Sequence, residues 1–424
     1  MRPEVRRNAF LLAACLVCNS AALQLAAALS SLTLVAVTGI KGILGLGPAI
    51  FLASGAAAVG PGGRLMDRVG RMPVIRGGFA GGAVGCAAVA AGCRFSSVLL
   101  VCAGLALLGG SGAIALLSRA AAAEMFPPER RARGMSFVLF GSVSGALWGP
   151  VLFGPLFAHR GVEAHALAAP WLIGIPFMLA GFGIASFVRP DPMEIATTYP
   201  AERDASVPAA PLREIVRRPG VSAALVAAVA SFAVMASVMN LAGYVAVGRG
   251  HHQGDVFTMI SIHILGMFGL ILIVGDLIDR FGRRRALVAG LALMTVSNAA
   301  LIWVTGVGGM SLALLGLGLG WNFSYVAATT ELVSLTSPAE RGRLIGFSDL
   351  LASVVAAGLA LLGGLVYTAP ASWPWRSRRR LSRPCRPSGW PPGPPCDRLP
   401  PPTEVPSRIS LQSRVGGRLS ASFL

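Results

Sequence analysis

Eleven long apolar stretches, each with at most one charged residue, constrain the fold of this chain more than any other feature of its sequence. In a helix, about 20 such residues rise about 30 Å, the thickness of the hydrocarbon core of a bilayer. Only 13% of the residues are charged, against about 25% in a soluble domain. The sequence therefore predicts an all-α polytopic membrane protein with spans at residues 9–34, 42–62, 74–93, 98–122, 135–158, 167–188, 221–247, 256–274, 286–305, 310–333 and 344–366.

A polar segment divides these spans into a group of six and a group of five. Residues 189–219 contain six prolines and charges of both signs, which is typical of a linker. We expect an N-terminal six-helix bundle at 1–188, a cytoplasmic linker at 189–219 and a C-terminal bundle with five visible spans at 220–368. Residues 369–424 form a tail rich in arginine and proline, without a candidate span.

The tail conflicts with the rule that basic residues stay in the cytoplasm, because eleven spans would leave it outside. We hypothesise that a frameshifted reading frame has replaced a twelfth helix. A genuine disordered extension is the alternative.

Arginines occur on alternate connections between the spans. The connections opposite to the N-terminus hold little more than Lys41, Arg94, Arg160 and Arg249. This bias predicts a multi-pass protein of the inner (cytoplasmic) cell membrane with a cytoplasmic N-terminus. It also accounts for the net charge of +18, and since no basic face or aromatic platform accompanies that charge, we expect no nucleic-acid partner. The cytoplasmic arginine clusters lie at residues 2–7, 64–71, 130–133, 280–285 and 341–343.

Two of these clusters belong to an internal repeat. Gly63-x-x-x-Asp67-Arg68-x-Gly70-Arg71 returns 212 residues later as Gly275-x-x-x-Asp279-Arg280-x-Gly282-Arg283. A second pattern, Pro-x-x-Arg-x-Arg, begins at residues 128 and 338, an offset of 210. Two matched features at nearly the same offset predict a duplicated six-helix unit.

The first of these motifs resembles the signature of the major facilitator superfamily, G-x-x-x-D-R-x-G-R-R/K between the second and third helices. Met72 stands where a second basic residue is common, whereas the copy at 275–284 is complete. The segments HILGMF at 263–268 and GLGWNFSYVAATTEL at 318–332 look like signatures of a bacterial, uncharacterised branch of that family. The resemblance covers about residues 8–368. It implies two six-helix bundles, the second apparently without its twelfth helix, in a secondary transporter that works by alternating access.

The repeated motif is suited to a conformational gate. Glycine permits a tight reversal with positive φ, an aspartate is favoured by a helix dipole, and arginines bond acids and carbonyls across an interface. We expect Arg119 to bridge to Asp67, and Asp349 to meet Arg68 or Arg71. The alternative is that these charges only orient the hairpin. The expected gate residues are Gly63, Asp67, Arg68, Gly70, Arg71, Arg119, Glu124, Gly275, Asp279, Arg280, Gly282, Arg283, Glu331 and Asp349.

The fifth span contains glycines at four-residue spacing. Gly141, Gly145 and Gly149 precede Pro150, a pattern that allows close helix contact and a local bend. It is similar to the family's antiporter motif associated with efflux, although Gly154-Pro155 replaces the usual closing Gly-Gly. Generic helix packing is the alternative, so the motif favours export without requiring it.

Polar side chains within spans are costly and usually face a cavity or a partner helix. His263 is the only histidine in a span, and its ordinary titration near neutrality suggests proton coupling. The alternative for each polar residue is a hydrogen bond between helices. The residues that we expect to outline a central substrate cavity are Asn19, Gln24, Asn240, His263, Asn322 and Tyr325.

These features together predict a transporter that moves a small organic solute, coupled to protons, with export of a drug-like compound or metabolite favoured. Uptake of a sugar or organic acid and a transport-dead product are the alternatives. The sequence contains no phosphate loop, metal-ligand cluster or catalytic constellation. We therefore expect no enzymatic activity, no cofactor and no metal, and a monomer in the lipid bilayer.

Overall fold

The computed structural model describes residues 2–127, 130–157, 161, 163–198 and 210–368. The chain divides into two units, Met1–Ala369 and Pro370–Leu424. The hypothesis of a replaced twelfth helix falls on the second unit and lies outside the described residues. All that follows concerns the first unit.

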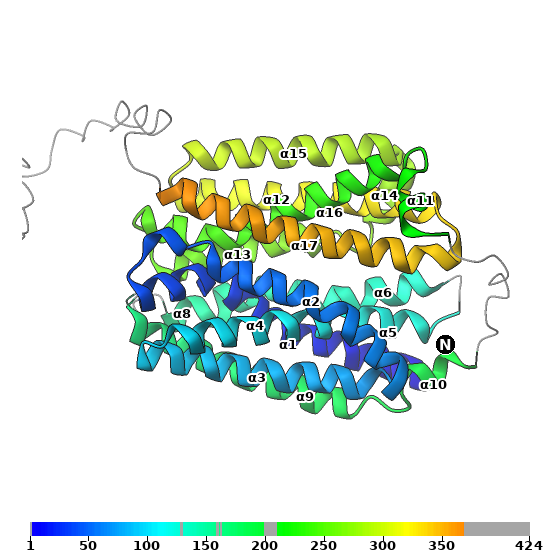
Figure 1. Ribbon diagram of the computed structural model, residues 1–424, viewed down its shortest axis with the longest axis horizontal. Coiled ribbons are helices and arrows are strands. Elements are labelled where there is room, and N and C mark those ends of the chain that lie inside the picture. Colours follow the sequence, from blue (N-terminus) through cyan, green and yellow to red (C-terminus); the bar gives the residue numbers. More distant parts are fainter. Residues whose placement is uncertain (1, 128–129, 158–160, 162, 199–209, 369–424) are drawn as a thin grey trace, which may run out of the picture. The chain divides into compact units, whose positions relative to one another are not determined.

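The first half of this unit consists of helices that run back and forth along one direction (Figure 1). The fourth predicted span is formed by α4 and α5 in succession, and the fifth by several short helical segments in place of one regular helix. The elements are α1 (Pro3–Thr38), η1 (Lys41–Ile43), α2 (Leu46–Val69), α3 (Arg71–Phe95), α4 (Val98–Leu116), α5 (Ser118–Glu124), α6 (Arg131–Phe140), η3 (Gly141–Ser144), α7 (Gly145–Trp148), η4 (Gly149–Phe153), α8 (Gly154–Phe157) and α9 (Ala164–Ser186).

The second half follows two short helices of the linker, α10 (Pro192–Ala196) and α11 (Leu212–Arg217). Its sixteen-residue helix α13 is joined by a run of turns to α14. The eighth predicted span, 256–274, is occupied by most of α13 and these turns, and α14 begins at its last residue. No strand occurs among the described residues. The elements are α12 (Val221–Gly248), α13 (Gln253–Phe268), α14 (Val274–Phe281), α15 (Arg283–Trp303), α16 (Val307–Ser334) and α17 (Pro338–Thr368).

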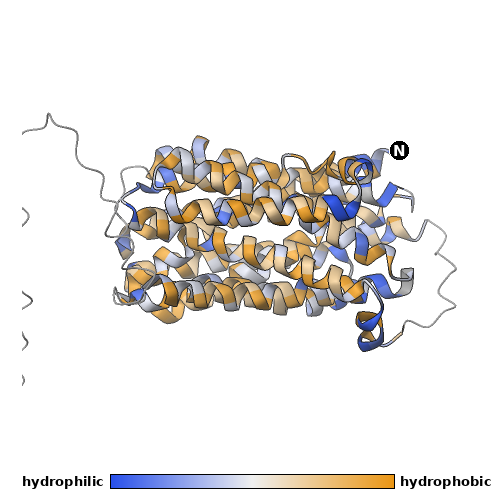
Figure 2. Cartoon of the chain, turned by 90° about the horizontal axis from the view of Figure 1, so that it is seen from above, coloured by the Kyte–Doolittle hydropathy of each residue, from blue (hydrophilic) through white to orange (hydrophobic). Residues whose placement is uncertain are grey.

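Ten helical segments of the described chain are long and apolar enough to cross a membrane. The predicted all-helical, polytopic fold is therefore confirmed, and the eighth predicted span is not among these ten segments. Apolar residues predominate along the length of the helices, and hydrophilic residues gather at their two ends (Figure 2). Large side chains such as Leu99 (78% exposed) and Trp303 (82% exposed) remain uncovered, as expected for a surface that faces lipid.

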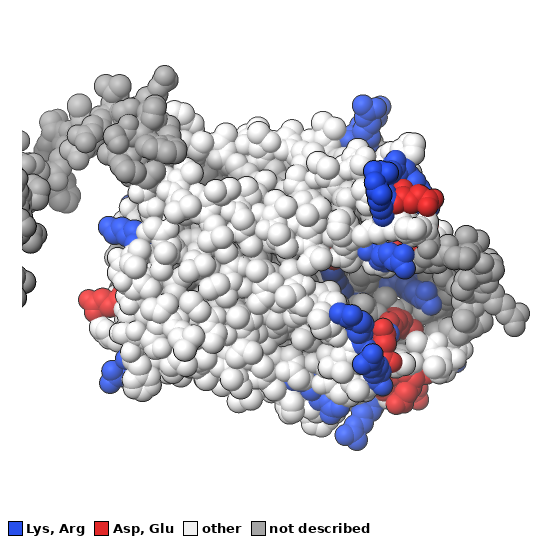
Figure 3. Space-filling model, viewed as in Figure 1, with Lys and Arg blue, Asp and Glu red and all other residues white. Residues whose placement is uncertain are grey.

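The two ends differ in charge. Most of the charged side chains in view lie at the end that carries the N-terminus, with few at the opposite end (Figure 3). We call these the basic end and the far end. The far end holds the connections near Lys41, Ser96, Arg249 and Gly306.

The halves contact each other closely toward the far end. A side chain at Gly45, just before α2, would collide with the backbone of Ala360 in α17, and one at Gly243 in α12 would collide with the backbone of Ala28 in α1. All four residues lie in the far part of their helices or connections. The backbones of the two halves therefore approach each other on that side.

Candidate functional site

At the basic end of the first half, Arg71 is held between two carboxylates. Gly70 ends α2 with φ 94° and thereby makes Arg71 the first residue of α3. From there its guanidinium donates to Glu124 at the end of α5 through two bonds of 2.9 Å, and to Asp67 in the last turn of α2 at 2.6 Å. A paired bond of this kind fixes orientation as well as distance. We call Asp67, Arg71 and Glu124 the N-half latch.

Asp191, which the sequence did not single out, completes the surroundings of this latch. Its carboxylate accepts hydrogen bonds from the backbone N–H groups of Arg71 (3.1 Å) and Met72 (2.9 Å), and from that of Met193 (2.9 Å). It therefore satisfies free donors at the start of both α3 and α10. The sequence signal was present, because aspartate followed by proline is a typical helix start.

The second half repeats the latch in a weaker form. Gly282 reverses the chain with φ 90°, and Arg283 at the start of α15 donates to Glu331 at 3.3 Å. Both side chains are 41% exposed, and this pair has one contact where Arg71 has three. The side chain of Asp279 lies outside the described part of the structure, and Arg68 and Arg280 are exposed. We call Arg283 and Glu331 the C-half latch.

The first glycines of the two motifs are not required by close packing in this structure. Among the described residues, a Cβ added at Gly63 or Gly275 would meet nothing within 4 Å. Gly70 and Gly282 are different, because both adopt the positive φ that the sequence predicts for the turn.

The end of the linker is anchored to the second half through Glu340, which the sequence also did not single out. Arg218 donates to its carboxylate through bonds of 2.7 and 2.8 Å, and the backbone N–H groups of Ala210 and Ser337 donate at 3.3 and 3.1 Å. The Glu340 side chain is only 5% exposed. Each end of the linker is thus bound through a carboxylate. Asp191 of the linker binds the start of α3 in the first half, and Glu340 of the second half binds Arg218 of the linker.

An ion pair joins the two halves near the basic end. Arg119 of α5 lies 3.7 Å from Asp349 of α17, and the hydroxyl of Tyr325 in α16 donates to the other Asp349 oxygen at 2.7 Å. Arg119 and Asp349 are 31% and 30% exposed, so water reaches both. We call these three residues the central triad.

The central triad corrects two pairings expected from the sequence. Arg119 contacts Asp349 in place of Asp67, and Asp349 contacts Arg119 and Tyr325 in place of Arg68 or Arg71. The reason is that Asp67 already bonds Arg71 within its own half, whereas Arg119 projects from α5 toward the other half.

Aromatic rings continue from the triad into the second half. The indole of Trp321, one turn before Tyr325 in α16, stacks on the Tyr325 ring with centroids 5.2 Å apart and planes at 15°. The Phe232 ring of α12 also lies near the Tyr325 ring, with the two centroids 6.1 Å apart. The indole nitrogen of Trp321 is buried and finds no hydrogen-bond partner among the described residues.

Toward the far end, the halves are closed by a second set of contacts. The Gln24 amide in α1 donates to the Phe257 carbonyl (3.0 Å) and to the Ser261 hydroxyl (2.7 Å), both in α13. The Phe257 ring packs 5.3 Å from Phe153 and 5.9 Å from Phe157, which belong to the other half. We call these five residues the far-side seal.

The glycines of the fifth span bring that span close to its neighbours. The helix is 3₁₀ over Gly141–Ser144 and π-helical over Gly149–Phe153, with Pro150 in the π turn. A side chain at Gly149 would collide with the Ser261 hydroxyl, the Phe257 carbonyl and the Gln24 amide. Gly145 is less crowded, because its added Cβ would lie 3.2 Å from Ile264 and Ser20.

The structure does not bring the six expected cavity residues to one point. Tyr325 belongs to the central triad and Gln24 to the far-side seal, while Asn19 is buried on α1. His263 bonds the Leu314 carbonyl at 2.7 Å and Asn322 donates to the Met267 carbonyl, so both join α13 to α16. Asn240 donates to Ala236 within α12. Most of these residues thus form hydrogen bonds between helices, which was the alternative expected for each of them. A central cavity lined by all six stays a prediction.

Comparison with known proteins agrees with this architecture. The family model of the Major Facilitator Superfamily matches residues 10–361. The riboflavin transporter RfnT of Brucella anthropi is 32% identical over 304 residues, covering 69% of this chain and 72% of that protein. The uncharacterized MFS-type transporter YddS of Bacillus subtilis is 27% identical over 337 residues, covering 77% of each.

Solved structures show the same fold at low sequence identity. The xylose transporter XylE from E. coli, in a partially occluded inward open conformation, aligns with a TM-score of 0.64 at 13% identity, over 87% of this chain and 93% of that one. The human organic anion transporter MFSD10 (TETRAN) aligns with a TM-score of 0.58 at 18% identity, over 87% and 94%. With its repeated turn motif, its multiple helical spans and a family match over most of its length, the chain belongs to the Major Facilitator Superfamily of membrane transporters.

Proposed function

We propose that this transporter moves a small organic solute by alternating access and couples the movement to a proton carried by Asp349. The observation that carries the proposal is the central triad, in which an acid of one half is bound by an arginine of the other. Water reaches this carboxylate, because the Asp349 side chain is 30% exposed. Protonation removes its charge and with it the attraction to Arg119.

The ion pair between Arg119 and Asp349 is weak enough to break and form again in every transport cycle. Partly exposed ion pairs contribute about 1 kcal/mol or less. A difference of about 1 kcal/mol shifts a two-state equilibrium about fivefold, enough to bias the two halves without locking them. The far-side seal, by contrast, is buried and supports a state that is closed at the far end.

We assign the basic end to the cytoplasm, because positive residues are retained on that side of a membrane. In this orientation the arginine-rich turns and the linker face the cytoplasm of the inner membrane, and the central triad receives its proton or solute from that side. In this proposal the transporter acts as a monomer, since the two halves of one chain enclose the transport path between them.

For the solute we propose a planar aromatic compound, with riboflavin as the first to test. Two observations support this choice: a relative at 32% identity is named a riboflavin transporter, and Trp321 and Tyr325 form an aromatic stack beside the triad. Flat heterocycles bind such surfaces by stacking, and the unpaired Trp321 N–H supplies a donor for one polar edge.

Export against proton entry is the proposed direction, supported by the glycine and proline pattern of the fifth span. The test uses purified protein in vesicles with the basic end outward, an acidic lumen and external riboflavin. Antiport predicts riboflavin accumulation in the lumen. Accumulation only when the external medium is made acidic would indicate uptake symport instead, and absence of flux under both gradients would support a transport-dead product.

A further inference from the structure

Four buried residues follow one face of α13 along the boundary between the halves. Their spacing of four, three and four positions keeps them on a single helix face, and they are Phe257, Ser261, Ile264 and Phe268. Phe257 and Ser261 belong to the far-side seal. Phe268 meets the Trp321 indole edge-on, with the ring centroids 6.0 Å apart. The far-side seal and the aromatic stack are therefore the two ends of one stripe.

The two ends of this stripe are close together. Ser261 and Phe268 are seven residues apart, which is about 10 Å of helix. Gln24, which bonds Ser261, lies near the middle of the 36-residue helix α1, and the substrate sites of transporters are found at this depth. A solute whose ring lies on the stack of Trp321 and Tyr325 therefore needs only a short side chain to reach Gln24.

The Gln24 amide is only half used in this structure. Its nitrogen donates to the Phe257 carbonyl and the Ser261 hydroxyl, and the carbonyl, which can only accept, fixes the nitrogen on the side of α13. Its oxygen Oε1 is buried and finds no hydrogen-bond partner among the described residues. A buried acceptor without a donor is costly. The amide therefore has an open acceptor at the boundary of the two halves.

Opening of the far end changes what this amide can bind. Phe257 and Ser261 belong to the other half, so Gln24 loses both acceptors of its N–H groups when the far-side seal separates. A hydroxyl group both donates and accepts. One solute hydroxyl can donate to Oε1, and a neighbouring one can accept from the amide nitrogen. A hydroxylated chain therefore compensates the open state for the bonds that the seal loses.

We propose that Gln24 binds the hydroxylated chain of a solute whose ring lies on the stack of Trp321 and Tyr325, and that this bond favours opening of the far end. The proposal rests on the proposed function, because it takes a flat aromatic solute as given. It narrows the solute to aromatic compounds that carry an aliphatic chain with hydroxyl groups, such as the ribityl chain of riboflavin. Lumiflavin, which has the same ring and a methyl group in place of that chain, is expected to bind the stack without opening the seal.

Two readouts on the full chain in lipid nanodiscs separate binding from opening. Quenching of flavin fluorescence measures the affinity for riboflavin and for lumiflavin. Pulsed electron paramagnetic resonance between labels at Lys41 and Gly306, both exposed at the far end, measures the far-open population in a chain without its native cysteines. The wild type is expected to bind riboflavin about fivefold more tightly than lumiflavin, as one neutral hydrogen bond would give. At saturation, riboflavin should raise the ratio of open to closed forms about fivefold over lumiflavin.

Gln24→Leu and Ser261→Ala form a matched pair, because each removes a contact of the seal but only the first removes the amide. Both should raise the far-open population in the absence of solute. Ser261→Ala should keep the preference for riboflavin, whereas Gln24→Leu should bind the two flavins equally and respond to them equally. If Gln24→Leu does not fold, Gln24→Asn, whose shorter side chain withdraws the amide, is expected to give the same loss.

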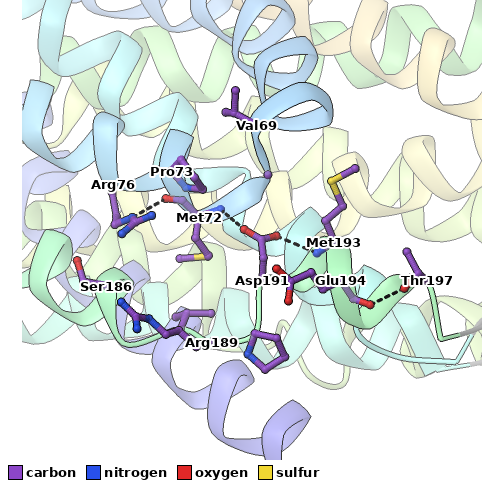
Figure 4. A pocket seen from close by; sticks show the side chains of 13 residues that line it. Val69, Met72, Pro73, Arg76, Ser186, Arg189, Asp191, Met193, Glu194 and Thr197 are labelled. Atoms are coloured by element: carbon purple, nitrogen blue, oxygen red, sulfur yellow. Dashed lines mark hydrogen bonds between the residues drawn. The ribbon is translucent and has the colours of Figure 1, made fainter.

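A hydroxyl outside the path supplies a second control. Thr197 lines a separate pocket at the basic end, where its hydroxyl donates to the Glu194 carbonyl of α10 (Figure 4). Thr197→Ala should leave both affinities and the distance distribution as they are in the wild type. A loss there as large as in Gln24→Leu would show a general effect of removing polar groups, and would overturn the assignment to Gln24.

The outcomes separate this proposal from the proposed function. If neither flavin binds the wild type, the proposed solute fails and recognition of its chain fails with it. If riboflavin binds but lumiflavin binds as tightly, or if Gln24→Leu keeps the wild-type preference, only recognition of the chain by Gln24 is overturned. If riboflavin binds more tightly but leaves the far-open population at the lumiflavin level, coupling of the chain to opening is overturned.

Discussion

Replacing Gly149 by alanine should open the far side of the transporter. The added methyl group would lie closer than van der Waals contact allows to three groups of the far-side seal, namely the Ser261 hydroxyl, the Gln24 amide and the Phe257 carbonyl. The two side chains can rotate away, but the carbonyl belongs to the backbone of α13 and cannot. In the Gly149→Ala variant, the far-side seal must therefore either become strained or open.

The size of the effect follows from the cost of overpacking. An extra methyl group in a well-packed interior costs about 1–3 kcal/mol, which corresponds to a shift of about 5- to 150-fold in a two-state equilibrium. Gly145→Ala provides a milder step, because its Cβ would be 3.2 Å from Ile264 and Ser20. Gly183→Ala is the matched control, since nothing lies within 4 Å of its added carbon.

Spin labels at Lys41 and Gly306, two exposed far-end positions on different halves, measure the separation by pulsed electron paramagnetic resonance. The seven native cysteines are first replaced by serine or alanine. The long-distance population should rise in the order Gly183→Ala, Gly145→Ala, Gly149→Ala. A Gly149→Ala distribution identical to that of the control would refute the reasoning, because the seal would then tolerate the methyl group.

Three further comparisons test the basic end. Arg71→Gln should reduce flux more than Arg283→Gln, because Arg71 makes three bonds to two acids and Arg283 makes one; equal losses in vesicle flux would contradict the difference between the latches. Asp191→Ala should lower thermal stability by about 1 kcal/mol through loss of a helix cap, measured as a decrease in Tm, and an unchanged Tm would show that water replaces the carboxylate. Arg218→Gln should also lower Tm, because Glu340 would keep only backbone donors in a buried position; the exposed Arg68→Gln is its control.

The helices, their repeat and the two turns were predictable because their signals are local. Apolar runs predict the spans, and the motif of nine residues predicts the positive φ of Gly70 and Gly282. The eighth span was harder, because hydropathy at 256–274 does not reveal that the regular helix ends at Phe268. The turns that follow Phe268 are as apolar as the helix before them, so hydropathy does not distinguish the two.

The partners of the charged residues were not predictable, because they depend on how helices are rotated and placed. Arg119 and Asp349 are separated by 230 residues in the sequence and lie on different halves. Gln24 and His263 were recognised as polar residues in spans, but a sequence does not state whether such a group faces a cavity or the next helix. Asp191 and Arg218 were overlooked because they lie in a segment whose prolines and mixed charges indicated only a linker.

The most direct measurement of the coupling compares two modes of transport in vesicles, exchange of labelled solute without a gradient and accumulation driven by a proton gradient. Asp349→Asn should retain exchange but lose gradient-driven accumulation, whereas His263→Ala should retain both. Undiminished accumulation by Asp349→Asn would contradict a proton carried in the central triad. If His263→Ala alone lost accumulation, the coupling group would be the histidine that the sequence first suggested.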